Sequence, residues 1–289
     1  MARKKVKKCK IKKLKQKISY LCTGWGTKKK KMSKISSIKE RFFDVLRLIV
    51  VGNPWSYNFE ADGIYYSRKG SELTVTAGRN RYCGRVVVPA TVTRKNETYN
   101  VTAIGESAFE NCKELTDVVI PDSAHSIGNY AFYGCSALVS VVIGKKVMSF
   151  GERAFTRCPN LRSVTIRSHN VAATSYNWLN NIPTTFGPNV KEYIIGEGVT
   201  VIGKEAFYGC FNIKSVTIPS SMKKIGKGAF SGCSDFTDVT CHAETPPVIE
   251  GDAFVRVSEA RATLRVPASA LETYRTSAPW SNFGTIQPI

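Results

Sequence analysis

The chain has 289 residues, of which 43% are apolar and 22% are charged, a balance typical of a folded globular protein. This composition excludes a largely disordered chain, a collagen-like chain and a small disulfide-rich protein. No apolar run reaches the roughly 18 residues that a membrane-spanning helix needs. The formal net charge of +20 is uneven, because residues 1–41 carry 17 Lys and Arg and only one acid, Glu40.

Residues 1–56 form a basic first segment for which three hypotheses stay open. A Lys-rich tract binds nucleic-acid phosphates without reading sequence, and anionic membranes attract it equally. The segment could instead be a disordered, solvated tail. It could also be a degenerate export segment, because a charged stretch precedes the apolar residues 42–51, although Asp44 and Arg47 interrupt them. The same stretch fits an amphipathic helix.

A repeat dominates the rest of the chain. The pair Ala-Phe recurs, and Cys usually follows three residues after the Phe. The phenylalanines, spaced by 23, 23, 52, 23 and 24 residues, are Phe109, Phe132, Phe155, Phe207, Phe230 and Phe254. The cysteines are Cys112, Cys135, Cys158, Cys210 and Cys233. A period of this length indicates a solenoid, in which each coil buries its apolar side against its neighbours.

A six-residue segment rich in Val, Ile and Thr keeps the same period and predicts one β-strand per coil. Its first, fourth and sixth residues are apolar and are expected to face the core, so the third and fifth face outward. The segments are 115–120, 138–143, 161–166, 190–195, 213–218 and 236–241.

The gap of 52 residues between Phe155 and Phe207 equals 23 plus 29, so one coil carries six extra residues. Counting from its strand places Trp178 in the aromatic column and the extra residues near 182–187. Phe186, inside this insertion, is predicted to be exposed. Together with Tyr176 and Trp178 it makes a candidate sugar- or peptide-binding cluster, although Trp178 is expected to belong to the core.

These motifs resemble the BspA-like branch of leucine-rich-repeat proteins, a family of surface proteins. Residues 213–234, IKSVTIPSSMKKIGKGAFSGCS, match its repeat unit almost letter for letter. Residues 59–66 with 86–92 are similar to its N-terminal β cap, and 244–254 with 263–289 to its C-terminal cap. The resemblance implies a leucine-rich-repeat superhelix of 23-residue β-rich coils with β caps at both ends. It also implies a secreted or cell-surface location, with the cytoplasm as the alternative.

The expected organisation has four parts. Residues 1–56 form the basic segment, 57–103 the N-terminal β cap, 104–241 the leucine-rich-repeat coils, and 242–289 the last coil with the C-terminal cap.

Neither a catalytic site nor a metal or cofactor site is expected. No CxxC pair occurs and the three histidines are far apart, which argues against zinc and thioredoxin-like sites. The cysteine column is expected to be buried free thiols that act as small apolar fillers. The acids among the outward strand residues lack an environment that shifts a pKa and excludes water, so we expect no enzymatic activity.

The predicted binding surface is the outward face of the strands, because solenoids present repeated columns as extended binding surfaces. The expected function is a non-enzymatic recognition scaffold for a protein or glycan partner, as in surface adhesion. Nucleic-acid or anionic-surface binding by the Lys-rich segment, or a structural spacer role in an envelope, are the alternatives. The predicted contact residues are Asp117, Val119, Ser140, Val142, Ser163, Thr165, Glu192, Ile194, Ser215, Thr217, Asp238 and Thr240.

Overall fold

The structure is a computed structural model that describes residues 58–289, apart from residues 79, 178, 255, 256 and 258. The hypotheses for residues 1–56 and the predicted place of Trp178 therefore lie outside the described residues. None of the described helices has the length and apolar composition needed to cross a bilayer.

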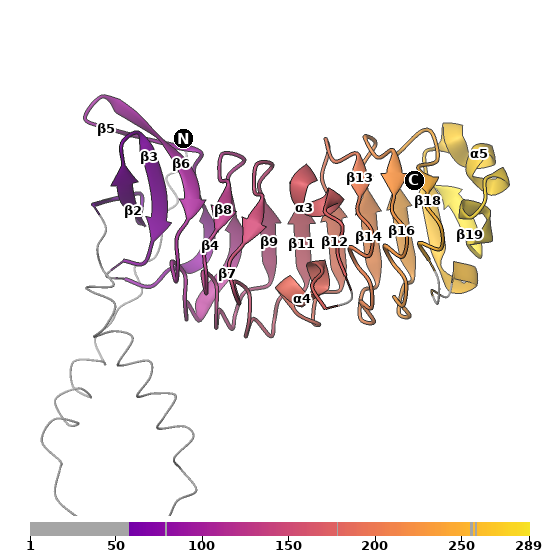
Figure 1. Cartoon of the computed structure of the whole chain (residues 1–289), viewed down its shortest axis with the longest axis horizontal. Coiled ribbons are helices and arrows are strands. Elements are labelled where there is room, and N and C mark those ends of the chain that lie inside the picture. Colours follow the sequence, from indigo (N-terminus) through magenta and orange to yellow (C-terminus); the bar gives the residue numbers. More distant parts are fainter. Residues whose placement is uncertain (1–57, 79, 178, 255–256, 258) are drawn as a thin grey trace, which may run out of the picture.

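One long side of the molecule is a nine-stranded parallel sheet (Figure 1). Each coil adds one strand, and neighbouring coils pair in parallel because the chain turns in the same sense each time. The strand order is β19-β18-β16-β14-β12-β11-β9-β7-β4. The strands are β4 (Cys83–Val87), β7 (Glu114–Val119), β9 (Ser140–Ile143), β11 (Ser163–Ile166), β12 (Glu192–Ile195), β14 (Ser215–Ile218), β16 (Asp238–Cys241), β18 (Thr263–Val266) and β19 (Thr285–Pro288).

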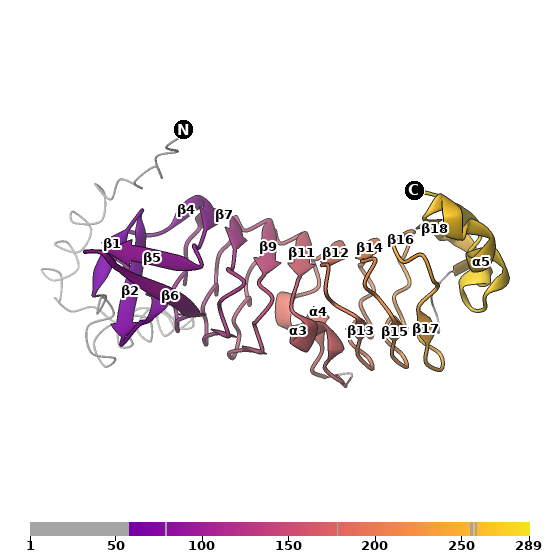
Figure 2. The same ribbon diagram turned by 90° about the horizontal axis from the view of Figure 1, so that it is seen from above.

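The opposite side carries two-residue strands in two separate groups (Figure 2). Two short helices, α3 (His169–Ala173) and α4 (Ile182–Phe186), lie between the groups. The first group is β8 (Ser126–Ile127) with β10 (Ser149–Phe150), and the second is β13 (Val201–Ile202), β15 (Lys224–Ile225) and β17 (Val248–Ile249).

Different structures cover the two ends of the coils. At the N-terminal end β1, β2 and β3 pair antiparallel, β3 pairs parallel with β6, and β5 forms a hairpin with β6. These strands are β1 (Phe59–Ala61), β2 (Ile64–Lys69), β3 (Glu72–Thr76), β5 (Thr91–Arg94) and β6 (Glu97–Ile104). At the other end, α5 (Leu271–Thr276) and the short 3-10 helices η1 (Glu259–Arg261), η2 (Ala268–Ala270) and η3 (Trp280–Asn282) flank β18 and β19.

A column of aromatic rings runs through the core. Ring centroids of Phe132 and Phe155 are 4.9 Å apart with the planes 6° from parallel, and those of Phe207 and Phe230 are 5.1 Å apart at 4°. Inward Val and Ile side chains of the parallel strands pack around this column. The predicted repeat solenoid is confirmed.

The cysteine column is buried beside the aromatic column, as predicted, and the described cysteines are free thiols. The Sγ of Cys135 donates to the Phe109 carbonyl at 3.0 Å, and Cys158 repeats the contact with Phe132 at 3.2 Å. These two thiols therefore bond back to the preceding coil. Burial raises the pKa of the Cys112 thiol to about 11 and that of Cys158 to about 12.

The irregular coil, residues 167–189, departs from the predicted register. The Ile182 amide donates to Ala206 O at 3.1 Å, just as Phe207 N donates to Ala229 O in the next coil. Ile182 therefore takes the backbone place that counting had given to Trp178. Ile182 lies 16 residues after Ile166, the last residue of the preceding strand. In a regular coil the corresponding distance, as from Ile120 to Phe132, is 12 residues, so four of the six extra residues precede Ile182. The predicted placement of the insertion at 182–187 is wrong.

The predicted exposure of Phe186 is also wrong, because its side chain is only 1% exposed. Its ring centroid lies 4.8 Å from that of Phe155, so Phe186 fills the aromatic column where Ile182 has no ring. Helix α4 makes this possible. Asn181 accepts from the Thr184 amide and Thr184 Oγ1 accepts from the Asn181 amide, a reciprocal cap that starts the helix one turn before Phe186.

Candidate partner-binding face

The outward side chains of the nine-stranded sheet form one surface, called the sheet face below. Register pairs the third residue of each predicted strand with the third residue of the next, and the fifth with the fifth. All twelve predicted contact residues are half-buried and lie in two adjacent columns. The six-residue insertion does not interrupt them, because Ser163 pairs with Glu192 and Thr165 with Ile194 across the irregular coil.

The sheet face extends beyond the predicted residues at both ends. The end strands were missed because their sequence spacing breaks the period, as between Arg85 and Asp117, which pair although they are 32 residues apart. The available signal was the alternation of polar and apolar residues within 263–266, TLRV. The added members are Arg85, Val87, Thr263, Arg265, Thr285 and Gln287.

Each of two acids in the first column bonds a serine on the adjacent strand. Ser140 Oγ donates to Asp117 Oδ1 at 2.5 Å, and Ser163 Oγ donates to Glu192 Oε2 at 2.7 Å. Such bonds to carboxylates are charge-assisted and hold the side chains in fixed positions. The acids are therefore part of an ordered polar row.

The third acid, Asp238, forms an ion pair with Arg265 of the neighbouring strand. The bond from the Arg265 guanidinium is the main cause that lowers the pKa of the Asp238 carboxyl below its usual value. Because both side chains are more than a third exposed, solvent screens the pair and its contribution to stability is small. Its main effect is to fix two charged groups at one end of the face.

The second column changes in character along the solenoid. Valines occupy its N-terminal part, and Val87 is 55% exposed. Thr217 and Thr240 follow toward the other end, and Arg265 and Gln287 complete it. The sheet face thus offers apolar contacts at one end and hydrogen-bonding and charged groups at the other.

The described residues contain no group of three or more His, Cys, Asp or Glu side chains placed to hold a metal ion. His125, His169 and His242 are exposed and lie in different coils. The chemistry that the sheet face offers is that of surface contact, through methyl groups, hydroxyls and fixed charges.

The sequence and the fold were compared with known proteins. A family model described as "BspA type Leucine rich repeat region" matches in six copies, over residues 93–185 and 186–270. These matches span more than half of the chain. No curated protein matches it.

Several solved structures resemble it. A leucine-rich repeat protein from Bacteroides ovatus is 27% identical, with a TM-score of 0.41 and 74% of this chain covered. The match spans only 60% of the length of that protein. A leucine rich cell surface protein from Faecalibacterium prausnitzii is 22% identical (79% and 72% of the two chains, TM-score 0.39). The T. pallidum leucine rich repeat protein is 21% identical (70% and 92%, TM-score 0.43). The family assignment rests on the six repeat matches.

Proposed function

Because this chain belongs to the BspA-type leucine-rich-repeat family, we propose that it is a non-enzymatic scaffold that binds a protein or glycan partner through the sheet face. The family suggests a protein-interaction scaffold. The proposal adds the surface used, an adhesive role, and a secreted or cell-surface location.

The observation that supports it is the continuity of the sheet face. Nine strands in register present two unbroken columns, although one coil carries six extra residues. The insertion is accommodated on the opposite side, where α3 and α4 replace a short strand (Figure 2).

The side chains of the face suit an extended partner better than a small molecule. The twelve predicted contact residues are half-buried, most of them are Ser, Thr, Val or Ile, and they repeat from strand to strand. Many weak contacts of this kind give a useful affinity when they act together over a long surface.

The proposal is tested with the double substitution Thr165→Asn with Thr217→Asn, whose sites flank Ile194 at the middle of the face. Binding of the full chain is measured against immobilised extracellular proteins and glycans. We expect a loss of affinity of at least tenfold, because central interface residues contribute most. The matched control is Thr156→Asn with Thr245→Asn, two exposed threonines outside the sheet, which should bind as the unchanged protein does. Equal binding by both double variants would refute the use of this face.

A second candidate function rests on the charge of the first segment, which holds 18 of the 42 Lys and Arg residues. If that segment binds nucleic acid or an anionic surface, affinity should fall steeply with salt, because each phosphate contact releases counterions. The sheet-face variants would then leave binding unchanged. Absence of binding to every partner, with the chain folded, would favour a spacer role.

A further inference from the structure

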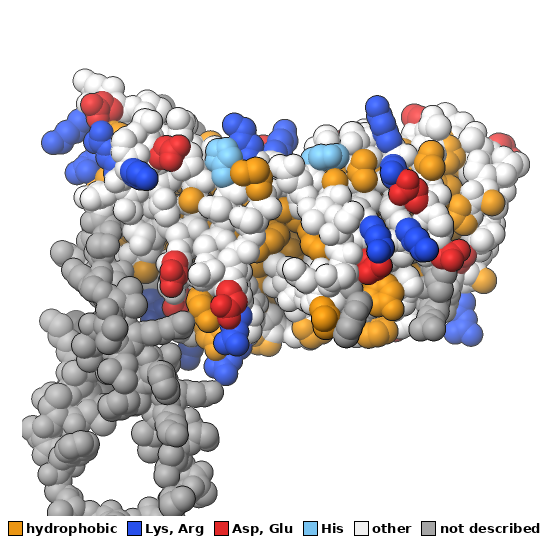
Figure 3. All heavy atoms as spheres, viewed as in Figure 1, with side chains coloured by type: hydrophobic (Ala, Val, Ile, Leu, Met, Phe, Trp, Pro, Cys, Tyr) orange, Lys and Arg blue, Asp and Glu red, His pale blue; other side chains and the backbone are white. Residues whose placement is uncertain are grey.

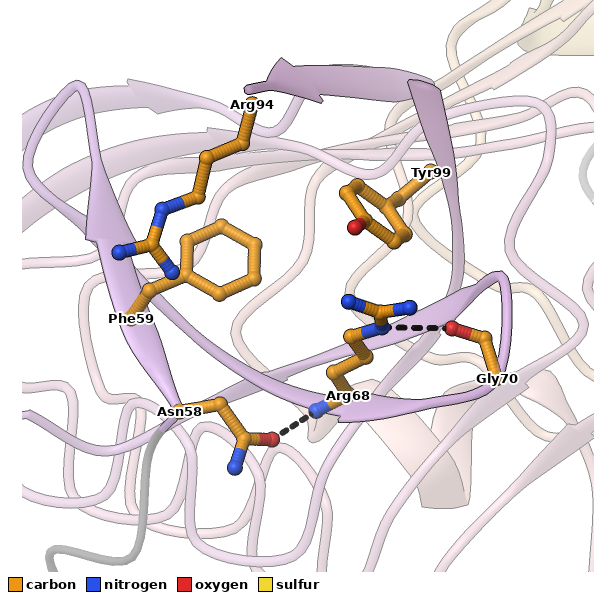
Figure 4. A pocket seen from close by; sticks show the side chains of 6 residues that line it. All are labelled: Asn58, Phe59, Arg68, Gly70, Arg94 and Tyr99. Carbon is orange, nitrogen blue, oxygen red and sulfur yellow. Dashed lines mark hydrogen bonds between the residues drawn. The ribbon is translucent and has the colours of Figure 1, made fainter. Parts of the chain in front are cut away.

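A pocket of about 370 Å³ lies in the N-terminal cap, away from the sheet face (Figure 4). It is formed where β1 and β2 approach the β5–β6 hairpin, and its volume falls within the range of small-ligand sites. Its lining consists of Asn58, Phe59, Arg68, Gly70, Arg94 and Tyr99. The lining therefore contains two cations and no acid.

Both arginines are held against aromatic rings. The Arg68 guanidinium carbon lies 4.4 Å from the centre of the Tyr99 ring, and that of Arg94 lies 4.7 Å from the centre of the Phe59 ring. A guanidinium at this distance from a ring is attracted to its face. Figure 4 shows the two guanidinium groups beside their rings on either side of the pocket. The cations are thus positioned before any ligand arrives.

Hydrogen bonds fix Arg68 further. Its Nε donates to the Gly70 carbonyl at 2.8 Å, and its backbone amide donates to Asn58 Oδ1. One side of the guanidinium is engaged in this way, which leaves its terminal nitrogens toward the pocket. Glu97 lies 3.7 Å from one of them, but both partners of this ion pair are about half exposed, so the pairing is weak.

Arg94 forms no ion pair among the described residues, although Glu97 stands opposite it in the β5–β6 hairpin; its guanidinium packs on the ring of Phe59. Lys69 and Lys95 follow the two arginines in sequence and are exposed. In Figure 3 the Lys and Arg side chains gather over this end of the molecule, near β2 and β5, with few acids among them. The pocket therefore lies in a local positive field.

We propose that this pocket binds the carboxylate of an acidic sugar unit, such as a uronic acid within a larger glycan. The planar guanidinium presents paired N–H donors that match the two oxygens of a carboxylate. The rings of Phe59 and Tyr99 line the pocket but are only 5% and 6% exposed, so little ring surface is left for an apolar side chain. Asn58 Oδ1 and the Gly70 carbonyl already accept from Arg68, and the Tyr99 hydroxyl donates to Glu97. The Asn58 side-chain NH₂ is left to bond a sugar hydroxyl.

The two arginines also cover the rings of Phe59 and Tyr99, as a purely structural cap would. Binding must therefore be separated from packing. Arg94→Gln removes the charge but keeps part of the side-chain stem, and Arg94→Lys keeps both stem and charge while removing the paired donors. Arg261→Gln, an exposed arginine near the opposite end of the solenoid, is the matched control.

The probe is trigalacturonic acid, compared with its methyl ester, in which the carboxylates are blocked and the sugar is unchanged. Titration calorimetry of the full chain at about 0.15 M salt limits binding by exposed charges elsewhere. We expect the acid to bind and the ester not to bind. Arg94→Gln should weaken binding about tenfold, the effect of one charge-assisted hydrogen bond. Arg94→Lys should weaken it less, and Arg261→Gln should leave it unchanged.

Several outcomes would overturn the proposal. Equal binding of acid and ester would show that the carboxylate is not recognised. Unchanged binding in both Arg94 variants would place the binding elsewhere, including in the Lys-rich segment. Tighter binding of a blocked triglutamate peptide than of the uronate would assign the pocket to acidic peptides. Melting temperature is measured for each variant, and Arg94→Lys decides the matter if Arg94→Gln does not fold.

Discussion

The regular coils and the irregular coil build the same core from different parts of the chain. In a regular coil one Phe supplies both the backbone amide that bonds the next coil and the ring of the aromatic column. In the irregular coil these tasks are divided. Ile182 supplies the amide, and Phe186, from the end of α4, supplies the ring that packs on Phe155.

The strand that follows the irregular coil, β12, differs as well. Tyr193 stands where the paired strands carry Val164 and Val216, and its ring centroid lies 4.9 Å from that of Phe207. Phe186 and Tyr193 thus fill the part of the core between Phe155 and Phe207. Phe186 packs on Phe155, and Tyr193 packs on Phe207. The comparison teaches that the fold requires filled core volume and continuous backbone bonding, whereas the residue that meets each requirement can change.

Phe186→Ala tests this interpretation with the largest expected effect. If Phe186 replaces the column phenylalanine, its truncation should reduce the free energy of unfolding by about 3–5 kcal/mol, as for a buried ring in a packed core. Chemical denaturation followed by circular dichroism measures it. Phe132→Ala in a regular coil should cost a similar amount, and Phe211→Ala, whose ring is 64% exposed, should cost little. A Phe186→Ala effect as small as that of Phe211→Ala would contradict the substitution of one ring by the other.

Gly203→Ala examines how closely the irregular coil approaches its neighbour. A Cβ on Gly203 would lie 1.9 Å from the carbonyl oxygen of Thr174, and one on Gly226 would lie 2.7 Å from the amide nitrogen of Lys204. Both are too close for an unshifted backbone. We expect each substitution to destabilise by about 1–3 kcal/mol, with the larger effect at Gly203. Melting temperatures of the two variants decide the order.

The regular coils could be predicted from the sequence because each meets the same packing requirement at a constant interval. Burial of Phe, Cys and the inward strand residues follows from that interval alone. The irregular coil could not be placed by counting, since counting assumes that the insertion follows the aromatic position. In the structure most of it precedes that position, in a turn where Asn177 Oδ1 accepts from the amides of Leu179 and Asn180.

The candidate sites differ in the same way. The columns of the sheet face follow from strand alternation and the repeat, so twelve of their members were predicted from sequence. The pocket of Arg68 and Arg94 was not, because it depends on the pairing of β3 with β6, which brings two hairpins together in the N-terminal cap. The sequence of neither strand indicates that β3 pairs with β6.

The buried thiols give a pH-dependent prediction of intermediate size. Burial raises the pKa of Cys158 to about 12 from an ordinary value of 9.0, so above pH 9 the unfolded chain loses this proton before the folded chain does. Stability should therefore be complete below pH 9 and fall as the pH rises toward 12, by about 1.4 kcal/mol per pH unit for this thiol. Cys158→Ala should remove that part of the slope in denaturation curves recorded between pH 9 and 11.

The thiol prediction has an independent check at neutral pH. In a chain with Cys9 and Cys22 replaced by Ser, a thiol reagent should label half-buried Cys83 first. The column cysteines should react only after unfolding. Rapid labelling of Cys158 in the folded chain would contradict its burial.

The smallest expected effect concerns Tyr193, whose hydroxyl is buried and has no hydrogen-bond partner among the described residues. A buried polar group without a partner has lost its water and gained nothing in exchange, so its removal should be neutral or stabilising, by about 1 kcal/mol at most. Tyr193→Phe keeps the ring that closes the aromatic column and removes only the oxygen. Tyr274→Phe is the matched control, because the Tyr274 hydroxyl is also buried but donates to the Ala243 carbonyl at 2.9 Å. That variant should lose about 1 kcal/mol of stability. If Tyr193→Phe loses as much, the Tyr193 hydroxyl has a hydrogen-bond partner, and Tyr193 contributes more to the core than the volume of its ring.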